Sequence, residues 1–260
     1  MADTGTMTDS LKLLVLKGLR YRTVIDLGCA DGHFFVQHYG LGMFAGAVPV
    51  NVDANPIYEP SLKAVRDTLG GHYVIAAASD RGGEIELTLG SHPYWSSLLK
   101  ENDPYWQRMN KLHTGTLKVS AVTVDSLVRQ FALQPPFLIK LDIQGAELAV
   151  LKGARETLRE TDVVICEIDL AEFHHLDLVM REESFSLFDM TELRRLPDQS
   201  LSWFYPIYLN RRLDRIRSRT LWDPSMDQAA MEMQRKRREQ VLDYNARVLA
   251  EIRKARGGGT

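Results

Sequence analysis

A strand, a tight turn and the start of a helix follow one another within residues 24–34, and this stretch constrains the fold more than any other part of the chain. The apolar run at 24–27 contains one acid and is typical of a short buried strand. Small residues come next and let the backbone turn before a helix opens near Gly32. Such a turn brings backbone N–H groups and a helix N-terminus close to a ligand. The stretch therefore predicts the ligand-binding turn of an α/β fold.

The charges of this turn favour a cationic ligand over a pyrophosphate. Gly28 and Ala30 are followed by His33, where the third glycine of a dinucleotide-binding fingerprint would stand. Carboxylates beside the turn would repel a pyrophosphate and attract a positive charge. S-adenosylmethionine (SAM) has an ammonium and a sulfonium group and no phosphate, so we predict SAM as the ligand. A plain strand-to-helix turn with capping acids is the alternative. The predicted cofactor-binding residues of the turn are Asp26, Gly28, Ala30, Asp31 and Gly32.

Two later strand ends extend the predicted cofactor site. Asp53 ends an apolar run about 20 residues beyond the turn, the offset at which a carboxylate meets ribose hydroxyls in such folds. Ala54 follows it and is included in the site, although Asp53 could also simply end a strand. Ser79 and Asp80 follow the next run and are candidates for polar contacts to an adenine. The stretch 80–83 also suits a hairpin turn, and the two roles are compatible.

Strands alternate with helices along the first 210 residues. This rhythm predicts a parallel sheet with helices on both faces, closed by two further strands that are candidates for antiparallel pairing. The expected strands are 24–27, 47–52, 73–78, 84–89, 119–124, 137–142, 162–169, 185–188 and 203–209. A first helix is expected to be capped by Thr8 or Asp9, and Asp125 to cap a later one. From residue 211 the composition becomes Arg-rich. We therefore expect one domain over 1–210 and a basic helical C-terminal extension over 211–260.

Composition narrows the class of partner. The chain has 260 residues, 45% of them hydrophobic, and can bury one sizeable core. A net charge of −2 gives no global attraction to nucleic acid or anionic membranes, so no nucleic-acid partner is expected. The basic run at 235–238 reads as a solvated helix face, or as a surface for an acidic partner or a second copy. The two cysteines form no disulfide framework, and no apolar run reaches about 18 residues, which predicts a cytoplasmic protein without a membrane span.

The stretch 138–148, Leu-Ile-Lys-Leu-Asp-Ile-Gln-Gly-Ala-Glu-Leu, followed by Val-Leu-Lys-Gly-Ala at 150–154, closely resembles the signature of the FkbM-like methyltransferases. The resemblance covers about residues 8–210. Ala30 and Asp31 depart from the Gly-Ala-Asn-x-Gly form often seen in the family, and Asp53 stands where Glu is commoner. Other stretches that look like the family's are 24–34, 53–56, 79–82, 95–98 and 123–127.

The resemblance implies a fold and a reaction. The implied fold is α/β, a Rossmann-like class I methyltransferase fold with a seven-stranded, mostly parallel sheet and helices on both faces, here followed by the helical extension. The implied enzyme is a SAM-dependent O-methyltransferase that acts on a hydroxyl of a sugar, glycan or natural product by in-line displacement. Such an enzyme mainly positions the reacting atoms and excludes water. A sugar hydroxyl also needs a base or a divalent ion to help it lose its proton.

Acids at the C-terminal ends of the strands are the candidates for that help, because ligands of open α/β sheets bind at this edge. The catalytic candidates are Asp142, Glu167 and His174, with His175 as an alternative to His174. A Mg²⁺ site built from Asp142, Glu167 and Asp169 is a further option, since this ion uses few carboxylates and keeps several waters.

The remaining expectations concern neighbours of these acids and competing functions. Lys140 is expected to be a structural ion-pair partner, and Glu147 to cap its helix or join the site. The aromatic loop at 90–115 is a candidate lid over the substrate. N-methyl transfer is disfavoured because Asp142 is followed by Ile-Gln-Gly and not by a Pro-Pro-aromatic turn. A non-catalytic scaffold that assembles into a homo-oligomer through the Arg-rich helix is the other alternative.

Overall fold

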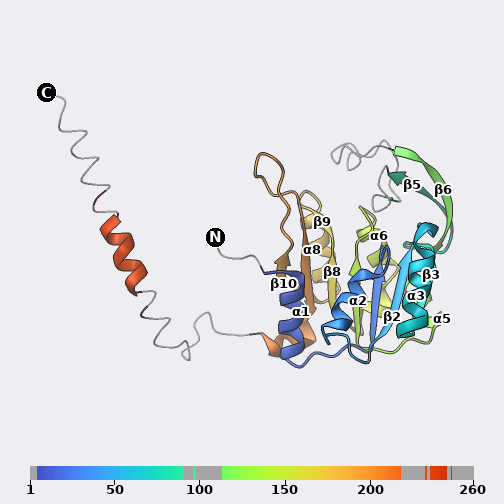
Figure 1. Ribbon diagram of the computed structural model, residues 1–260, viewed down its shortest axis with the longest axis horizontal. Coiled ribbons are helices and arrows are strands. Elements are labelled where there is room, and N and C mark those ends of the chain that lie inside the picture. The colour runs from blue at the N-terminus through green and yellow to red at the C-terminus, as the bar shows by residue number, and fades with distance from the viewer. Residues whose placement is uncertain are drawn as a thin grey trace. The chain divides into compact units, whose positions relative to one another are not determined.

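The computed structural model describes residues 5–90, 96–97, 113–217, 232, 235–244 and 247. The chain divides into two units, Met1–Ile216 and Arg217–Thr260 (Figure 1). The first unit extends beyond the boundary expected at residue 210, because a 3-10 helix, η3 (Arg211–Ile216), follows its last strand. In the second unit the described residues 235–244 are helical. Arg235 pairs there with Glu232 and Glu239 of its own helix, which suits a solvated helix face.

A mostly parallel sheet forms the centre of the first unit. Its strand order is β10-β11-β8-β7-β1-β2-β3, with β9 paired to β11. The strands β3, β2, β1, β7 and β8 are parallel to one another, whereas β11 is antiparallel to both β8 and β10. The expected seven-stranded, mostly parallel sheet is therefore confirmed. The bounds are β1 Thr23–Leu27, β2 Val48–Asp53, β3 His72–Ile75, β7 Phe137–Leu141, β8 Thr161–Cys166, β9 Ile168–Asp169, β10 Phe185–Thr191 and β11 Trp203–Asn210.

Helices cover both faces of this sheet because alternate residues of each strand point to opposite sides. Val24 and Leu138 pack with α1 and α2 in one hydrophobic cluster. Ile25 and Ile139 pack with α5, α6 and α8 in another. Burial of each such side chain contributes about 1.5–3 kcal/mol, so the two clusters hold the sheet between two helical layers. The helices are α1 Met7–Leu16, α2 His33–Gly40, η1 Pro56–Tyr58, α3 Glu59–Leu69, α5 Val124–Gln130, α6 Glu147–Lys152, α7 Arg155–Leu158 and α8 Phe173–Glu182.

Two helix starts differ from the sequence prediction. The N-cap of α1 is Thr6, whose side chain exchanges hydrogen bonds with Asp9 in a capping box, so neither Thr8 nor Asp9 is the cap. The N-cap of α5 is Thr123. Asp125 instead accepts hydrogen bonds from the backbone N–H and the hydroxyl of Thr157, at 2.8 and 2.6 Å, and so ties α5 to α7.

The strand expected at 73–78 is two strands in the structure. After β3 the chain leaves the central sheet, and β4 (Ala77–Ala78) joins a separate three-stranded sheet of order β4-β6-β5. The other members, β5 (Gly83–Gly90) and β6 (His113–Val122), pair antiparallel and lie at the β3 side of the unit (Figure 1). The strand ends here because the hydrogen-bond partners change: the backbone N–H of Ser79 donates to Val122 O of β6 at 2.9 Å and not to β2.

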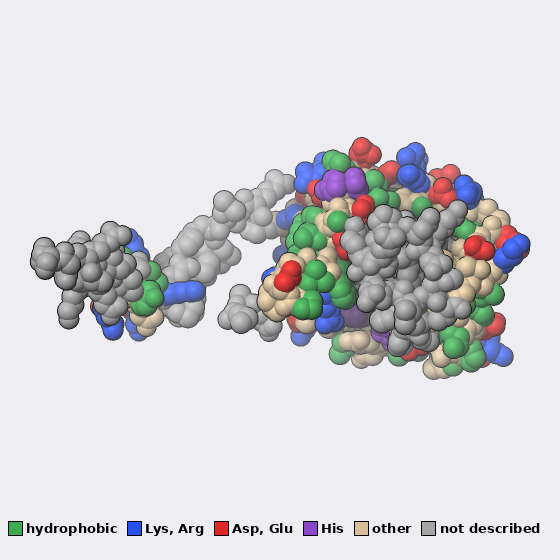
Figure 2. All heavy atoms as spheres, turned by 90° about the horizontal axis from the view of Figure 1, so that it is seen from above, with side chains coloured by type: hydrophobic (Ala, Val, Ile, Leu, Met, Phe, Trp, Pro, Cys, Tyr) green, Lys and Arg blue, Asp and Glu red, His purple; other side chains and the backbone are tan. Residues whose placement is uncertain are grey.

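Charge is mixed over the surface. In Figure 2, Lys and Arg side chains lie among Asp and Glu side chains on the described part of the visible face. This mixture agrees with the small net charge of −2. Among the residues that the structure describes, no helix is long and apolar enough to cross a membrane.

Candidate active site

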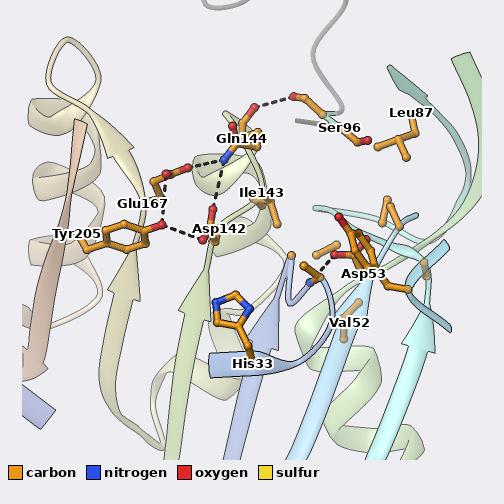
Figure 3. Close-up of a pocket in the computed structure, with 18 residues that line it drawn as sticks. His33, Val52, Asp53, Leu87, Ser96, Asp142, Ile143, Gln144, Glu167 and Tyr205 are labelled. Carbon is orange, nitrogen blue, oxygen red and sulfur yellow. Dashed lines mark hydrogen bonds between the residues drawn. The ribbon is translucent and has the colours of Figure 1, made fainter. Parts of the chain in front are cut away.

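A pocket of about 250 Å³ opens at the C-terminal ends of the central strands (Figure 3). It lies where the strand order reverses around β1, between β2 and β7, the point at which open α/β sheets bind ligands. The small sheet contributes Leu87 to the opposite wall. The lining residues are Gly28, Ala30, His33, Val52, Asp53, Ala54, Tyr58, Ala76, Ala77, Ala78, Leu87, Ser96, Ser97, Asp142, Ile143, Gln144, Glu167 and Tyr205.

The turn after β1 forms the floor of the pocket. Gly28 has φ +71°, and a Cβ on it would lie 2.0 Å from the backbone oxygen of Asp142, so no larger residue fits between β1 and β7. Ala30 also has positive φ, at 49°, which costs about 1–2 kcal/mol for a residue with a Cβ. Its N–H donates to Asp53 Oδ2 at 2.8 Å, which offsets part of that strain. Gly32, with φ +82°, is the N-cap of α2.

Asp53 lies at the end of β2 with its carboxylate in the pocket. Its two oxygens accept one backbone hydrogen bond each, from Ala30 N and Asn55 N, both at 2.8 Å. Burial raises the pKa of Asp53 to about 6, although these two hydrogen bonds oppose the shift. Each carboxylate oxygen keeps a free acceptor site, which suits a ligand with two neighbouring hydroxyls. Ala54 lines the pocket beside it.

Five of the predicted cofactor residues lie outside the pocket lining, among them Gly32, the N-cap of α2. Asp26 is fully buried below the pocket. The Asp31 carboxylate contacts the His33 ring, with Oδ1 2.8 Å from Nδ1. Ser79 is buried and donates to the exposed Asp80, so neither contacts the pocket. Ala76, Ala77 and Ala78 line the pocket in this region, because the chain leaves the central sheet after β3 and before it reaches Ser79 and Asp80.

Lys140 lies beneath the floor and joins two acids. Its Nζ is 3.0 Å from Asp142 Oδ2 and 3.4 Å from Asp26 Oδ1. Burial alone would lower the pKa of Lys140, but the two carboxylates outweigh burial and raise it. The expected structural ion pair is therefore confirmed, and it keeps a positive charge directly behind Asp142.

Two carboxyl groups face the pocket from neighbouring strands. Asp142 follows β7 and Glu167 follows β8, and their backbone N–H groups donate to Leu27 O at 3.0 Å and Leu141 O at 2.8 Å. The side-chain amide of Gln144 donates to both carboxyls. The phenol of Tyr205 donates to Asp142 Oδ2 at 2.9 Å and lies 3.3 Å from Glu167 Oε1 (Figure 3).

The two carboxyls differ in protonation. Burial raises the pKa of Asp142, but the Lys140 ammonium and several hydrogen bonds outweigh burial and lower it. Burial and the charge of Asp142 raise the pKa of Glu167 well above its usual range. These opposite shifts favour an ionised Asp142 that accepts a hydrogen bond from a protonated Glu167.

The two histidines that were candidates for the base lie outside the pocket lining. His174 and His175 are exposed on the first turn of α8 and do not line the pocket. Their Nδ1 atoms lie near Ala171 O at 3.2 Å and Glu172 Oε2 at 3.0 Å, both within the same helix start. Helical geometry points these residues outward, because the buried face of α8 is occupied by Leu176 and Met180.

Glu147 stabilises the loop before α6 and does not line the pocket. It is buried and accepts hydrogen bonds from the backbone N–H groups of Ile143 and Gly145, at 3.3 and 3.1 Å. Burial raises the pKa of Glu147 to about 7. Glu147 lies in the first turn of α6, but its side chain makes no capping hydrogen bond to that helix.

The predicted magnesium ligands are not assembled as a set. Asp169 Oδ1 accepts from Ala171 N at 2.8 Å, and Asp169 does not line the pocket. The oxygens of Asp142 and Glu167 already accept hydrogen bonds from Lys140, Gln144 and Tyr205. Within the described ranges, no group of three or more His, Cys, Asp or Glu side chains is arranged to hold a metal ion.

Sequence reasoning missed Tyr205 and Gln144. Tyr205 lies 63 residues from Asp142, in a strand whose only sequence signal is its apolar pattern. Gln144 lies inside the quoted signature, and a positive φ of 59° turns its side chain toward the acids. Of the expected lid, Ser96 and Ser97 line the pocket, while Tyr94, Trp95, Tyr105 and Trp106 lie outside the described residues.

Comparison with known proteins identifies a family. The family model described as "Methyltransferase FkbM domain" matches residues 26–187, more than half of the chain. A search of curated proteins found no match.

Among solved structures, a methyltransferase FkbM from Methylobacillus flagellatus KT is similar at 17% identity and a TM-score of 0.45, over 73% of this chain and 45% of that chain. The chain therefore spans less than half the length of that protein. A precorrin-6y C5,15-methyltransferase from Geobacter metallireducens GS-15 is similar at 9% identity and a TM-score of 0.41, over 81% and 93% of the two chains. An rRNA methylase from Streptococcus thermophilus is similar at 12% identity and a TM-score of 0.41, over 81% and 99%.

Proposed function

The chain belongs to the FkbM methyltransferase family, and from this premise we propose that it transfers the methyl group of SAM to a hydroxyl of a sugar, glycan or natural product. Its sheet has the order and directions of the Rossmann-like class I methyltransferase fold, so that expectation is confirmed. One observation carries the proposal. A single pocket brings the Asp53 carboxylate and the Asp142–Glu167 pair together around the turn at Gly28.

The lining residues fit SAM in shape and charge. Asp53 offers two acceptor oxygens to the ribose hydroxyls, and the apolar wall formed by Val52, Ala76–Ala78 and Leu87 suits a flat adenine. The carboxylates suit the ammonium and the sulfonium. No Lys or Arg lines the described part of the pocket, so a pyrophosphate lacks a counter-charge there.

The Asp142 and Glu167 end of the pocket suits the binding of a hydroxyl group that loses its proton during methyl transfer. When bound, SAM supplies a methyl carbon that forms a bond to the acceptor oxygen as its bond to sulfur breaks, the electron pair staying on sulfur. Asp142, ionised and facing the pocket, accepts the hydrogen bond of the acceptor hydroxyl and receives its proton. The strand ends hold the carboxylate in place, and Lys140 keeps it ionised until the proton arrives.

O-methyl transfer is favoured over N-methyl transfer by the backbone after β7. Enzymes that methylate amino groups grip them with backbone carbonyls at this position. Here the carbonyl of Gln144 accepts a hydrogen bond from Ser97 Oγ at 2.6 Å and is engaged within the protein.

A methyl-transfer screen tests the proposal. The protein is incubated with radiolabelled SAM and matched acceptors, each an alcohol and its amine analogue, drawn from simple glycosides, oligosaccharides and polyketides. Binding of S-adenosylhomocysteine (SAH) is measured in parallel by calorimetry, with NADH as the comparison ligand. We expect SAH binding and label transfer to alcohols. Binding of NADH without SAH would refute the cofactor, transfer to amines alone would refute the O-methyl assignment, and SAH binding without any transfer would favour the scaffold alternative.

A further inference from the structure

We infer that Tyr205 is a positioning residue. Its hydroxyl holds the carboxyl groups of Asp142 and Glu167 in fixed positions, so that together they accept the proton of the hydroxyl that is methylated. The inference rests on the proposed methyl transfer and deepens it, because it assigns a role to a strand that lies outside the family signature. Tyr205 itself lies outside residues 26–187, the range that the family model matches.

The register of β11 places Tyr205 beside the acids. Ile207 pairs with Ile165 and Phe204 with Ile168, so Tyr205 lies opposite Glu167. Residues opposite each other in an antiparallel pair point to the same face, with Cβ atoms about 5 Å apart. Asp142 lies one strand further, about 4.8 Å away in the sheet. A tyrosine is long enough for its oxygen to reach over Glu167 to Asp142, as Figure 3 shows.

The hydrogen bonds show that the carboxyls are held from two sides. Tyr205 binds Asp142 Oδ2 at 2.9 Å and Glu167 Oε1 at 3.3 Å, while the Gln144 amide binds the other oxygen of each carboxyl. A phenol has one proton to donate, so Tyr205 donates to the ionised Asp142, the nearer of the two. Neither carboxyl can rotate away without breaking a contact to Tyr205 or Gln144.

The fixed position of the two carboxyls affects the rate of the methyl-transfer step. The acceptor's O–H bond breaks as its oxygen bonds to the methyl carbon, and the proton forms an O–H bond with the carboxyl unit. The proton then leaves to water when the products leave. A base that is displaced by about 1 Å costs about 100-fold in rate. Removing the Tyr205 hydroxyl frees Asp142 on one side, so we expect kcat to fall about 10- to 100-fold. SAH affinity should stay within about twofold, because Asp53 and the turn are unchanged.

The test compares Tyr205→Phe with Tyr208→Phe. Tyr208 is a matched control, since it lies on the same strand and its hydroxyl contacts Asp177 at 3.4 Å, away from the pocket. Both variants lose one phenolic oxygen and keep the ring. Measurements are kcat and KM with an acceptor from the screen, SAH affinity by calorimetry, and Tm. A fall in kcat for Tyr205→Phe alone, with SAH affinity and the KM for SAM preserved, supports the inference. Equal kcat in the two variants overturns it.

Crystal structures of the SAH-bound variants give a readout that needs no acceptor. Altered positions of the Asp142 and Glu167 carboxyls in Tyr205→Phe, and not in Tyr208→Phe, support the positioning role of Tyr205. Unchanged carboxyls overturn it. A failure of the proposed function looks different, because the wild-type protein itself would then bind no SAH or transfer no methyl group.

Discussion

Replacing Asp142 by Asn removes the proposed proton acceptor while nearly preserving its shape. The carboxylate accepts hydrogen bonds from Lys140 at 3.0 Å, Tyr205 at 2.9 Å and Gln144 at 3.3 Å. Loss of a general base lowers the rate about 10²- to 10⁴-fold, or about 3–5 kcal/mol in the activation barrier. SAH affinity should stay within about threefold, because the cofactor contacts at Asp53 and the turn are separate from Asp142.

The same change has a calculable effect on stability. The Lys140 side chain is only 7% exposed, and the variant removes one of its two carboxylate partners. Asp26 remains at 3.4 Å, so the ammonium is not left unpaired. The lost charged hydrogen bond costs about 2 kcal/mol, which lowers Tm by about 4–8 °C for a domain of this size. Turnover must therefore be measured well below the new Tm.

The assay measures label transfer from SAM together with calorimetry of SAH binding. Glu156→Gln is the charge-matched control, because Glu156 is exposed and its pair with Arg129 at 2.8 Å contributes little. Turnover of Asp142→Asn within twofold of the wild type would refute the assignment of the base. A tenfold loss of SAH affinity would place Asp142 on the cofactor side and refute the division of the pocket.

Other substitutions probe the remaining parts of the site. Asp53→Ala should weaken SAH binding about 10- to 100-fold, the loss expected for one hydrogen bond to a charged group. Because the pKa of Asp53 is raised to about 6, calorimetry of the wild type should show SAH affinity falling as pH drops below about 6, and equal affinity at pH 5 and 8 would contradict the ribose role. Gly28→Ala should abolish SAH binding, since its Cβ would lie 2.0 Å from Asp142 O; retained binding by calorimetry would show that the turn is not needed. The raised pKa of Glu147, about 7, implies a stabilisation that is full below about pH 4.5 and lost as pH rises through 7. Thermal melts of Glu147→Gln should therefore lack a stability loss of about 3 kcal/mol that the wild type shows between pH 5 and 8, and parallel curves would refute this.

The strand ends illustrate what local sequence can predict. A buried strand needs apolar residues, and an acid directly after it must lie at the edge of the sheet, so the sequence alone predicts that Asp53, Asp142 and Glu167 share one edge. The structure brings all three to the pocket. The turn at Gly28 follows from the same local logic, because small residues between a strand and a helix have few other uses.

Residues whose role depends on a distant partner were not predictable in this way. His174 follows a strand end as Glu167 does, yet the first turn of α8 directs it to solvent. Ser79 follows the third strand, yet pairing with β6 takes it out of the central sheet.

The sequence by itself therefore determined the fold family, the order of strands and helices, and the acids at the strand ends, because these depend on periodicity and on neighbours along the chain. Only the tertiary structure decided which side chains act together. Lys140 meets Asp26 across 114 residues and Tyr205 meets Asp142 across 63. Such contacts depend on which strands become neighbours in the sheet, and the side-chain pattern within one strand does not specify its neighbours.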